Sequence, residues 1–294
     1  MPRPRQPGRH RRPEPVVAPE NAPALVLAVP GAPSSATRGI AEETLSIARS
    51  ELPGLDARIG FVEGGDEEFP ALDAVLGRAT SERAAAVSQD AAGTGEAQAE
   101  DGPTAVVVPL LAGPDAASVR QIRQIVLNSG PGAELTDVLG PHPLLAEGVH
   151  VKLSEAGLAR ADRARLFTVA TAADGIVLAA VGGEEAVQAA GITGMLLAAR
   201  LAVPVLAAGL DEEGAIARTA DQLRESGSQH LAVAPCLIGP EVPEGLLEAA
   251  AQEAGCSTAE PLGAYPAVGK LVASTYAAKL GIAQSQSQQG MPVR

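Results

Sequence analysis

Aromatic side chains are scarce in this chain of 294 residues: they make up 2% of it, and tryptophan is absent. Proteins that bind single-stranded nucleic acid stack the bases on aromatic rings, so this composition argues against that function. Long hydrophobic runs are also missing, because no apolar stretch reaches the roughly 18 residues that a membrane-spanning helix needs. We therefore expect no nucleic-acid partner, no membrane span, and a core of Val, Leu, Ile and Ala.

The common catalytic motifs are absent too. The sequence has no G-x-G-x-x-G, Walker A, H-E-x-x-H or G-x-S-x-G pattern, which removes the usual support for dinucleotide, nucleotide, zinc-protease or serine-hydrolase chemistry. Its two cysteines, Cys236 and Cys256, lack the spacing of a metal site. Because no export signal is recognisable, we expect reduced, structural thiols and a cytoplasmic protein.

The body of the chain has fewer cationic than anionic residues. The formal net charge is −13, although the first 21 residues carry five Arg and two Glu. An acidic body disfavours the clustered Lys and Arg that bind nucleic-acid phosphates. We expect disordered tails at 1–22, which is basic and rich in Pro, and at 283–294, which is rich in Gln and Ser. An interaction with a protein partner through the basic tail stays open.

Three segments recur in the same order in the two parts of the chain. The matched pairs are LVLAVPG (25–31) with IVLAAVG (176–182), VVVPLLAGP (106–114) with AVAPCLIGP (232–240), and LGPHPLL (139–145) with LGAYPAV (262–268). This order predicts two homologous halves, residues 23–160 and 161–282. The first half carries an extra low-complexity segment, 78–102, which we expect to form a mobile surface loop after finishing a helix.

Each half alternates short apolar runs with amphipathic stretches. Runs typical of buried strands lie at 24–29, 57–62, 104–110 and 133–138, and again at 175–181, 203–209, 230–238 and 257–262. The stretches between them have apolar residues at three- and four-residue spacing, as in Val119, Ile122 and Val126. We therefore expect an α/β protein with two similar halves, each a four-stranded parallel sheet with helices on both faces.

The first strand ends abruptly at Pro30 and Gly31, and a helix is expected to begin soon after. In α/β proteins, ligands bind beyond the carboxyl ends of strands. This strand end offers no His, Cys, Asp, Glu or Lys. The groups that suit a ligand carboxylate here are the backbone amides of 34–37, with the hydroxyls of Ser34 and Ser35.

Two histidines fall near the end of the first half. His142 lies between two prolines at an expected helix start, and the repeat places Tyr265 at the matching position. Capping of the helix or contact with a partner is the simpler interpretation of His142, and contact with a ligand is the alternative. His150 follows eight residues later, about two turns along. Helical chelation uses i, i+4 pairs, so we do not expect these two to hold one metal ion.

Carboxylates gather beyond the second strand of each half. Glu63 ends that strand in the first half and acidic residues 66–68 follow it, while acidic residues 211–213 follow the matching strand. Such clusters bind hard cations or accept protons. They are also typical of solvated loops before a helix, where carboxylates favour the helix dipole. The solvated loop is the simpler interpretation, and both stay open.

The chain resembles the sirohydrochlorin cobaltochelatases and ferrochelatases, the class II tetrapyrrole chelatases, in their two-halved actinobacterial form. The segments that carry the resemblance are ALVLAVPG, ARIGFVE, AVVVPLLAG, LGPHPLLAE, GIVLAAVGG, VAPCLIGP and LGAYPAV. It implies ATP-independent insertion of Co²⁺ or Fe²⁺ into sirohydrochlorin, a step of cobalamin or siroheme biosynthesis, in the cleft between the halves. It also implies histidines at strand ends that deliver the metal and accept pyrrole protons.

The sequence departs from this family at both ligand histidines. Pro30 stands where the family's first strand ends in His, and Ala116 or Ala117 stands where the second histidine follows the third strand. Of the family's metal-site pattern, Glu63 keeps its place as the acid of F-x-E. The resemblance therefore leaves Glu63 as the candidate catalytic and metal-ligating residue, for Co²⁺ or Fe²⁺.

Two functions stay open at this point. A divergent chelatase would use Glu63 and other acids in place of imidazole, whereas a non-catalytic scaffold would hold a tetrapyrrole, another small molecule or a protein in the same cleft. For a ligand rich in carboxylates we expect contacts from Gly31 and from Arg38, Arg120 and Arg123, which fall at strand-to-helix turns. We favour a chelatase-family protein that has lost imidazole-based insertion.

Overall fold

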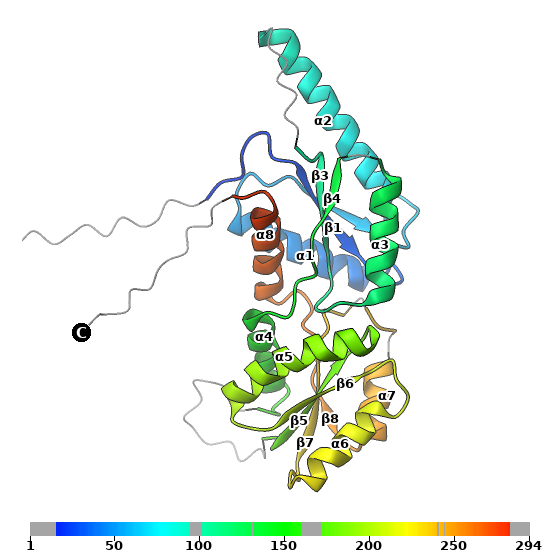
Figure 1. The fold of residues 1–294 in the computed structure, drawn as a ribbon, viewed down its shortest axis with the longest axis vertical. Helices are drawn as coiled ribbons and strands as arrows, with labels where there is room; N and C mark the ends of the chain where they lie inside the picture. Colours follow the sequence, from blue (N-terminus) through cyan, green and yellow to red (C-terminus); the bar gives the residue numbers. More distant parts are fainter. Residues whose placement is uncertain are drawn as a thin grey trace, which may run out of the picture.

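The computed structural model describes residues 16–94, 102–130, 132–159, 172–239, 241–243 and 245–282. In chain order its elements are β1 (Ala24–Val29), α1 (Ser35–Glu51), β2 (Ala57–Phe61), α2 (Leu72–Thr94), β3 (Ala105–Pro109), α3 (Ala116–Asn128), β4 (Ala133–Leu135), α4 (Pro143–Glu155), β5 (Gly175–Ala180), α5 (Gly183–Leu201), β6 (Val205–Gly209), α6 (Ala215–Glu225), β7 (Leu231–Pro235), α7 (Leu246–Glu253), β8 (Ser257–Thr258) and α8 (Pro266–Lys279). Figure 1 shows two lobes, each built around one sheet.

The two sheets have the same topology. Their strand orders are β2-β1-β3-β4 and β6-β5-β7-β8, and all neighbouring strands are parallel. Every residue of the central strands β1, β3, β5 and β7 is buried, as expected for a parallel sheet covered on both faces. The predicted α/β class, with two four-stranded parallel sheets flanked by helices, is therefore confirmed.

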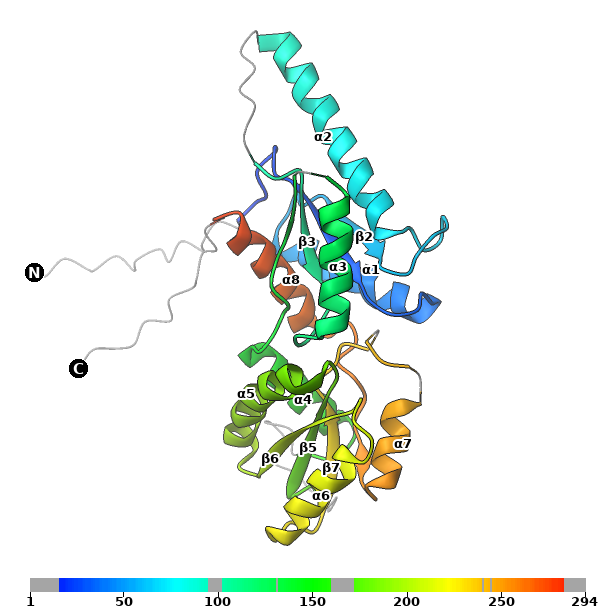
Figure 2. The same ribbon diagram turned by 45° about the vertical axis from the view of Figure 1, so that its right-hand side comes forward.

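Each half gives one helix to the other. On one face of the first sheet α1 packs beside α8, which comes from the end of the chain, and α2 and α3 cover the other face. On the second sheet α4 packs beside α5, and α6 and α7 cover the opposite face. Figures 1 and 2 show α8 in the lobe of β1 and α4 in the lobe of β5. The halves are thus joined by an exchange of helices.

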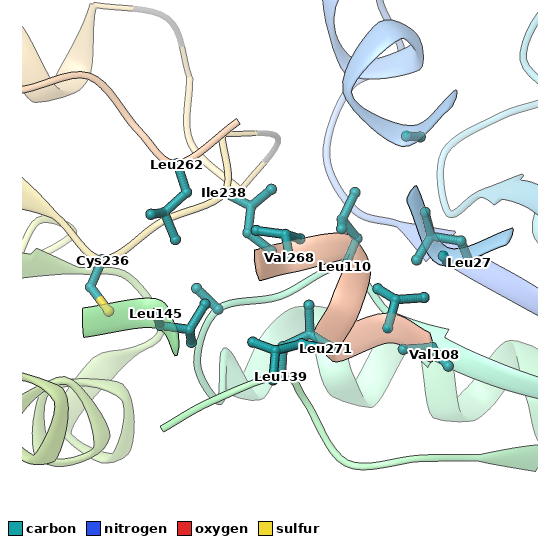
Figure 3. Close-up of a cluster of buried hydrophobic side chains, with 14 of the residues drawn as sticks. Leu27, Val108, Leu110, Leu139, Leu145, Cys236, Ile238, Leu262, Val268 and Leu271 are labelled. Atoms are coloured by element: carbon teal, nitrogen blue, oxygen red, sulfur yellow. The ribbon is translucent and has the colours of Figure 1, made fainter. Parts of the chain in front are cut away.

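The exchanged helices bury one continuous hydrophobic core. Figure 3 shows Leu110 after the first sheet's β3, Ile238 after the second sheet's β7, and Leu271 of α8 in a single cluster. The buried Tyr276 of α8 donates a hydrogen bond from its hydroxyl to the carbonyl of Pro23, just before β1, at 2.5 Å. Because this core is built from residues of both halves, we expect the two halves to unfold together in one cooperative transition.

Helix α2 is longer than the sequence pattern predicted. It continues to Thr94, so residues 78–94 are helical in the range where we expected mainly a loop. This stretch is rich in Ala with interspersed Glu, Gln and Arg, which have high helix propensity even where no apolar face repeats. Within the described part of the chain, no helix has both the length and the apolar character to cross a bilayer.

Several predictions concern residues that the structure does not describe. These are 1–15 in the basic tail, 95–101 in the predicted loop, 160–171 around the predicted boundary between the halves, and 283–294 at the end. The two tails, the mobile loop and the boundary therefore stay predictions.

Candidate functional site

The predicted site residues follow strands of the first sheet, and the carboxyl end of that sheet meets the carboxyl end of the second. A Cβ built on Gly182, just after β5, would lie 2.5 Å from the Cα of Asp115, which follows β3. A Cβ built on Gly239, after β7, would lie 3.4 Å from the Cδ1 of Ile40 in α1. The strand ends of one half therefore contact those of the other at this junction.

The turn from β1 into α1 is closed by local contacts. Pro30 is buried, and Gly31 takes a φ of +77°, a conformation that favours glycine. Ser34 and Thr37 form a capping box: the Ser34 hydroxyl accepts the Thr37 N–H at 3.1 Å, and the Thr37 hydroxyl accepts the Ser34 N–H at 2.9 Å. Ser35 begins the helix and is exposed. Two of the four amides expected to hold a carboxylate are thus used by the cap.

The acidic loop after β2 meets the start of α1. Glu63 is exposed there, and no hydrogen bond or ion pair joins it to another described residue. Arg38 donates from Nε to Glu42 Oε1 at 2.7 Å and from Nη1 to the carbonyl of Glu68 at 3.3 Å. The hydrogen bond to Glu42 raises the pKa of Arg38. The structure therefore brings Arg38 to the acidic loop, but its guanidinium is engaged within the protein.

The described residues do not fit a cobalt or iron site. In the part of the chain that the structure describes, no three His, Cys, Asp or Glu side chains come together in a way that could hold a metal ion. Asp66, in the same loop as Glu63, accepts the N–H of Phe69 at 2.6 Å. Pro30 and Ala116 have no donor atoms in their side chains. Glu63 is thus a single exposed carboxylate, fewer ligands than a divalent transition metal takes.

Helix α3 begins at the junction. Asp115 caps it by accepting the N–H of Ala117 at 3.0 Å. Further along the helix, Arg120 and Arg123 are exposed, and neither has a hydrogen-bond or ion-pair partner among the described residues. Arg120 follows Asp115 by little more than one turn. Of the predicted basic contacts, Arg120 and Arg123 are unpaired among the described residues, whereas Arg38 is paired with Glu42. Arg123 is the eighth residue of α3, so the prediction that it falls at a strand-to-helix turn is wrong.

The two histidines serve separate structural contacts. His142 caps α4, because its Nδ1 accepts the N–H of Leu144 at 3.1 Å. Burial lowers the pKa of His142, which favours the neutral imidazole that can accept this hydrogen bond. His150 is 3% exposed, and its Nδ1 accepts the Nε–H of Arg200 at 2.8 Å. Of the two interpretations of His142, the structure shows the cap.

Replacing His142 by Asn is expected to keep the cap and to remove a source of pH dependence. The pKa of His142 is lowered in the folded protein, so the unfolded chain takes up this proton first as the pH falls through about 6.5, and the fold loses stability. Asn also caps helices but does not titrate. Urea denaturation followed by circular dichroism should show wild type losing more stability than His142→Asn between about pH 7.5 and pH 5.5.

Two results bear on this prediction. His142→Ala lacks a capping atom and should cost about 1 kcal/mol at neutral pH, where His142→Asn is nearly neutral. Equal pH dependence of wild type and His142→Asn would contradict the role of His142.

Glu241 is absent from the predicted site residues, yet its carboxylate joins the two halves. Its Oε1 accepts the N–H of Ile238 at 3.0 Å and the N–H of Ala112 at 3.4 Å, and its Oε2 accepts the N–H of Gly239 at 2.6 Å. Ala112 belongs to the first half and the other two to the second. Burial raises the pKa of Glu241, against the opposing effect of these amides.

A pair of similar segments contained a signal for Glu241. The segment VVVPLLAGP is followed by Asp115 and the similar segment AVAPCLIGP by Glu241, so an acid follows both. Both residues line a cavity of about 10 Å³ together with Cys236 and Thr193, which is room for one water molecule. Burial raises the pKa of Cys236 to about 12, so its thiol is protonated. Most of the other lining residues are apolar, so a water in this cavity would depend on these four side chains for its hydrogen bonds.

The comparisons with known proteins bear on the fold. A scan of protein-family models and a search of curated proteins each gave no match. Among solved structures the chain is similar to CbiX, described as the terminal enzyme for the biosynthesis of siroheme in denitrifying bacteria: the TM-score is 0.53, the identity is 17%, and the match covers 87% of this chain and 98% of that chain. The fold is chelatase-like.

Other solved structures align less well. A conserved domain protein from Vibrio cholerae has a TM-score of 0.34 at 11% identity, covering 88% of this chain and 84% of that chain. A periplasmic binding protein from Burkholderia mallei has a TM-score of 0.32 at 12% identity, covering 81% of this chain and 60% of that chain. Scores this low carry no conclusion about fold or function. The similarity to CbiX, at its low identity, concerns the fold alone.

Proposed function

We propose that this protein is a member of the sirohydrochlorin chelatase family that has lost imidazole-based metal insertion and binds an acidic tetrapyrrole or a similar small molecule without metallating it. One observation carries the proposal. By the sequence resemblance, the positions of the family's metal-delivering histidines are taken by Pro30, which is buried after β1, and by Ala116 or Ala117 in the first turn of α3. The fold-level similarity to CbiX supports the family.

Metal insertion makes two chemical demands. A side chain must hold Co²⁺ or Fe²⁺ beside the macrocycle, and a base must take up the pyrrole protons as the metal enters. Imidazole meets both demands near neutral pH, whereas the side chains of proline and alanine meet neither. His142 and His150 are engaged in a helix cap and in a contact with Arg200. Glu63 alone offers one carboxylate in water, where its hold on a metal ion is weak.

Binding of an acidic ligand makes a different demand, which the chain meets better. Sirohydrochlorin is rich in carboxylates, and Arg120 and Arg123 of α3 are exposed cations without partners among the described residues. The net charge of −13 repels an acidic ligand at long range. At physiological salt this repulsion is largely screened beyond about 8 Å. We therefore place the ligand's carboxylates at the start of α3.

Insertion is tested by mixing the full chain with sirohydrochlorin and Co²⁺ or Fe²⁺ and following the absorption change against a control without protein. We expect the rate of metallation to equal that of the control. Metal-free sirohydrochlorin should nevertheless change its absorption when the protein is added, which reports binding. An accelerated metallation would overturn the proposal. If Glu63→Gln removed that acceleration, the protein would be a carboxylate-based chelatase instead.

The binding part has its own control. Arg120→Gln should weaken binding of metal-free sirohydrochlorin about tenfold, the size expected for one charge-assisted contact. Arg78 is likewise exposed, but it lies on α2, so Arg78→Gln should leave the affinity unchanged. Equal effects of the two substitutions, or no absorption change with wild type, would argue against a ligand at the start of α3.

A further inference from the structure

Most of the exposed large hydrophobic side chains lie on two helices. Among the described residues six such side chains are exposed, and four of them belong to α3 or α5: Leu127, Ile192, Met195 and Leu196. Single exposed hydrophobics are ordinary on a protein surface. The three on α5, however, follow the i, i+3, i+4 spacing that places side chains on one side of a helix. The outer side of α5 is therefore an apolar surface open to solvent.

The outer side of α3 carries unpaired positive charge beside its exposed leucine. The 13 residues of α3 include no Asp or Glu. Arg123 precedes Leu127 by one turn, and both side chains are exposed. Of the ten described arginines, seven donate to a group within the chain. The other three are Arg78, Arg120 and Arg123, and two of these lie on α3.

Helix α5 has the complementary order of side chains. From its start, Glu185 and Gln188 precede Ile192 and Met195 at alternating three- and four-residue spacing, which keeps all four on one side of the helix. Glu185 is exposed, and no hydrogen bond or ion pair joins it to another described residue. Counted from their N-termini, α3 thus presents cations and then a leucine, whereas α5 presents a carboxylate and then apolar side chains.

The two helices begin beside each other at the junction of the halves. A Cβ built on Gly182, the residue before α5, would lie 2.5 Å from the Cα of Asp115, the residue before α3. Figures 1 and 2 show α3 running from this point into the first lobe and α5 running from it into the second. A two-fold axis through this point that bisects the angle between the helices lays α3 of one copy along α5 of another, in the same direction.

We propose that the protein forms a two-fold dimer in which α3 of each copy packs along α5 of the other. The rise of about 1.5 Å per residue sets the register. Leu127 is the twelfth residue of α3 and comes level with the tenth and thirteenth of α5, Ile192 and Met195. Arg123, the eighth residue, stands beside Gln188 of the second copy and within reach of its Glu185.

Charge complementarity selects a second copy as the partner. Two chains that each carry a net charge of −13 repel each other, so their contact needs cations that are not already neutralised. Arg123 is such a cation, and Glu185 of the second copy is a carboxylate without a described partner. Arg120, one turn nearer the junction, is left for the ligand proposed above. The dimer is therefore independent of that ligand.

The size of the contact sets the concentration at which it forms. Helix α3 has 13 residues, so each strip of contact is about 20 Å long and about 10 Å wide. Each copy contributes two such strips, one on α3 and one on α5. This area falls at the small end of the range for specific interfaces. We therefore expect the dimer at about 50 µM protein, a concentration typical for weak specific association.

Sedimentation equilibrium of the full chain at that concentration tests the proposal. Wild type should give twice the chain mass of 29.6 kDa. Leu127→Glu should give the mass of the monomer, because it places a charge against the apolar side of α5; Leu127 is 69% exposed, so its replacement leaves the monomer folded. Val17→Glu is the matched control: Val17 is 56% exposed and precedes β1, and this variant should stay dimeric.

Charge reversal locates the contact. Arg123→Glu and Glu185→Arg should each raise the dissociation constant at least about tenfold, and the double variant should restore it, because the reversed charges again attract each other. Arg78→Glu, on α2, should leave it unchanged.

Three results would overturn the proposal. The first is a monomeric wild type. The second is a double variant that dissociates as readily as the single ones. The third is a dimer that survives Leu127→Glu but is lost with Met195→Glu, because α5 would then pair with α5 of the second copy.

Discussion

Gly269→Ala is expected to destabilise the protein by about 2 kcal/mol, although alanine favours helices more than glycine does. Gly269 lies in α8 where that helix crosses α1. A Cβ at this position would lie 2.5 Å from the Cβ of Ile47 and 2.8 Å from the carbonyl oxygen of Thr44. Neither atom is the end of a flexible side chain, so the helices must separate. Since the chain has no tryptophan, denaturation is best followed by far-ultraviolet circular dichroism.

The control for Gly269→Ala is a substitution that we expect to raise the free energy of unfolding. Gly39 lies in α1, the other helix of the same contact, and a Cβ there would meet nothing within 4 Å. Gly39→Ala should therefore stabilise the protein by about 0.5 to 1 kcal/mol through helix propensity alone. If both substitutions stabilised the protein to a similar degree, α8 would not pack against α1 at this distance.

The close crossing of α1 and α8 matters because it fixes how the halves are joined. Helix α8 follows the last strand of the second sheet but packs on the first, and α4 does the reverse. A separation of α8 from α1 therefore disturbs both lobes and the strand ends between them. We expect Gly269→Ala to shift one unfolding transition rather than to produce a second one.

Much of the fold could be predicted from the sequence, because most of its strands are short apolar runs between glycine- and proline-rich turns. The predicted runs 133–138 and 257–262 were too long, since β4 ends at Leu135 and β8 at Thr258. The predicted runs 24–29 and 57–62 coincide with β1 and β2 to within one residue. The exchange of α4 and α8 could not be predicted, because amphipathic periodicity shows that a helix has a buried face but not which sheet that face covers. The helical extent of 78–94 was missed because propensity, without periodicity, gives a weak signal.

The candidate site was harder to predict than the fold. The sequence shows that Pro30 cannot ligate a metal, and this needs no structure. It does not show that Arg38 is engaged by Glu42 or that the amide of Ser34 is used in a cap, because both depend on the geometry of one helix turn. The role of Glu241 was not predicted, because a carboxylate that follows a strand is usually solvated. Its contact with Ala112 depends on how the two halves pack.

Glu241→Ala is expected to be the most damaging single substitution at the junction. It leaves three backbone N–H groups, of Ile238, Gly239 and Ala112, without their acceptor. An unsatisfied buried donor costs about 1 to 3 kcal/mol, so we expect a loss of about 3 kcal/mol, reduced where water enters the space. Thermal denaturation should show the midpoint falling by several degrees. Glu248→Ala, at an exposed position in the first turn of α7, is the control and should lose only its favourable interaction with the helix dipole, about 0.3 to 1 kcal/mol.

The pH dependence of this loss identifies the carboxylate as its source. Burial raises the pKa of Glu241 above 4.5 in the folded protein, so its contribution is full below that pH and declines as the pH rises through the folded pKa. The difference in stability between wild type and Glu241→Ala should therefore be larger near pH 4.5 than at neutral pH. A difference that grew with pH would mean that the three amides outweigh burial. The ionised carboxylate would then be the form that holds the two halves together.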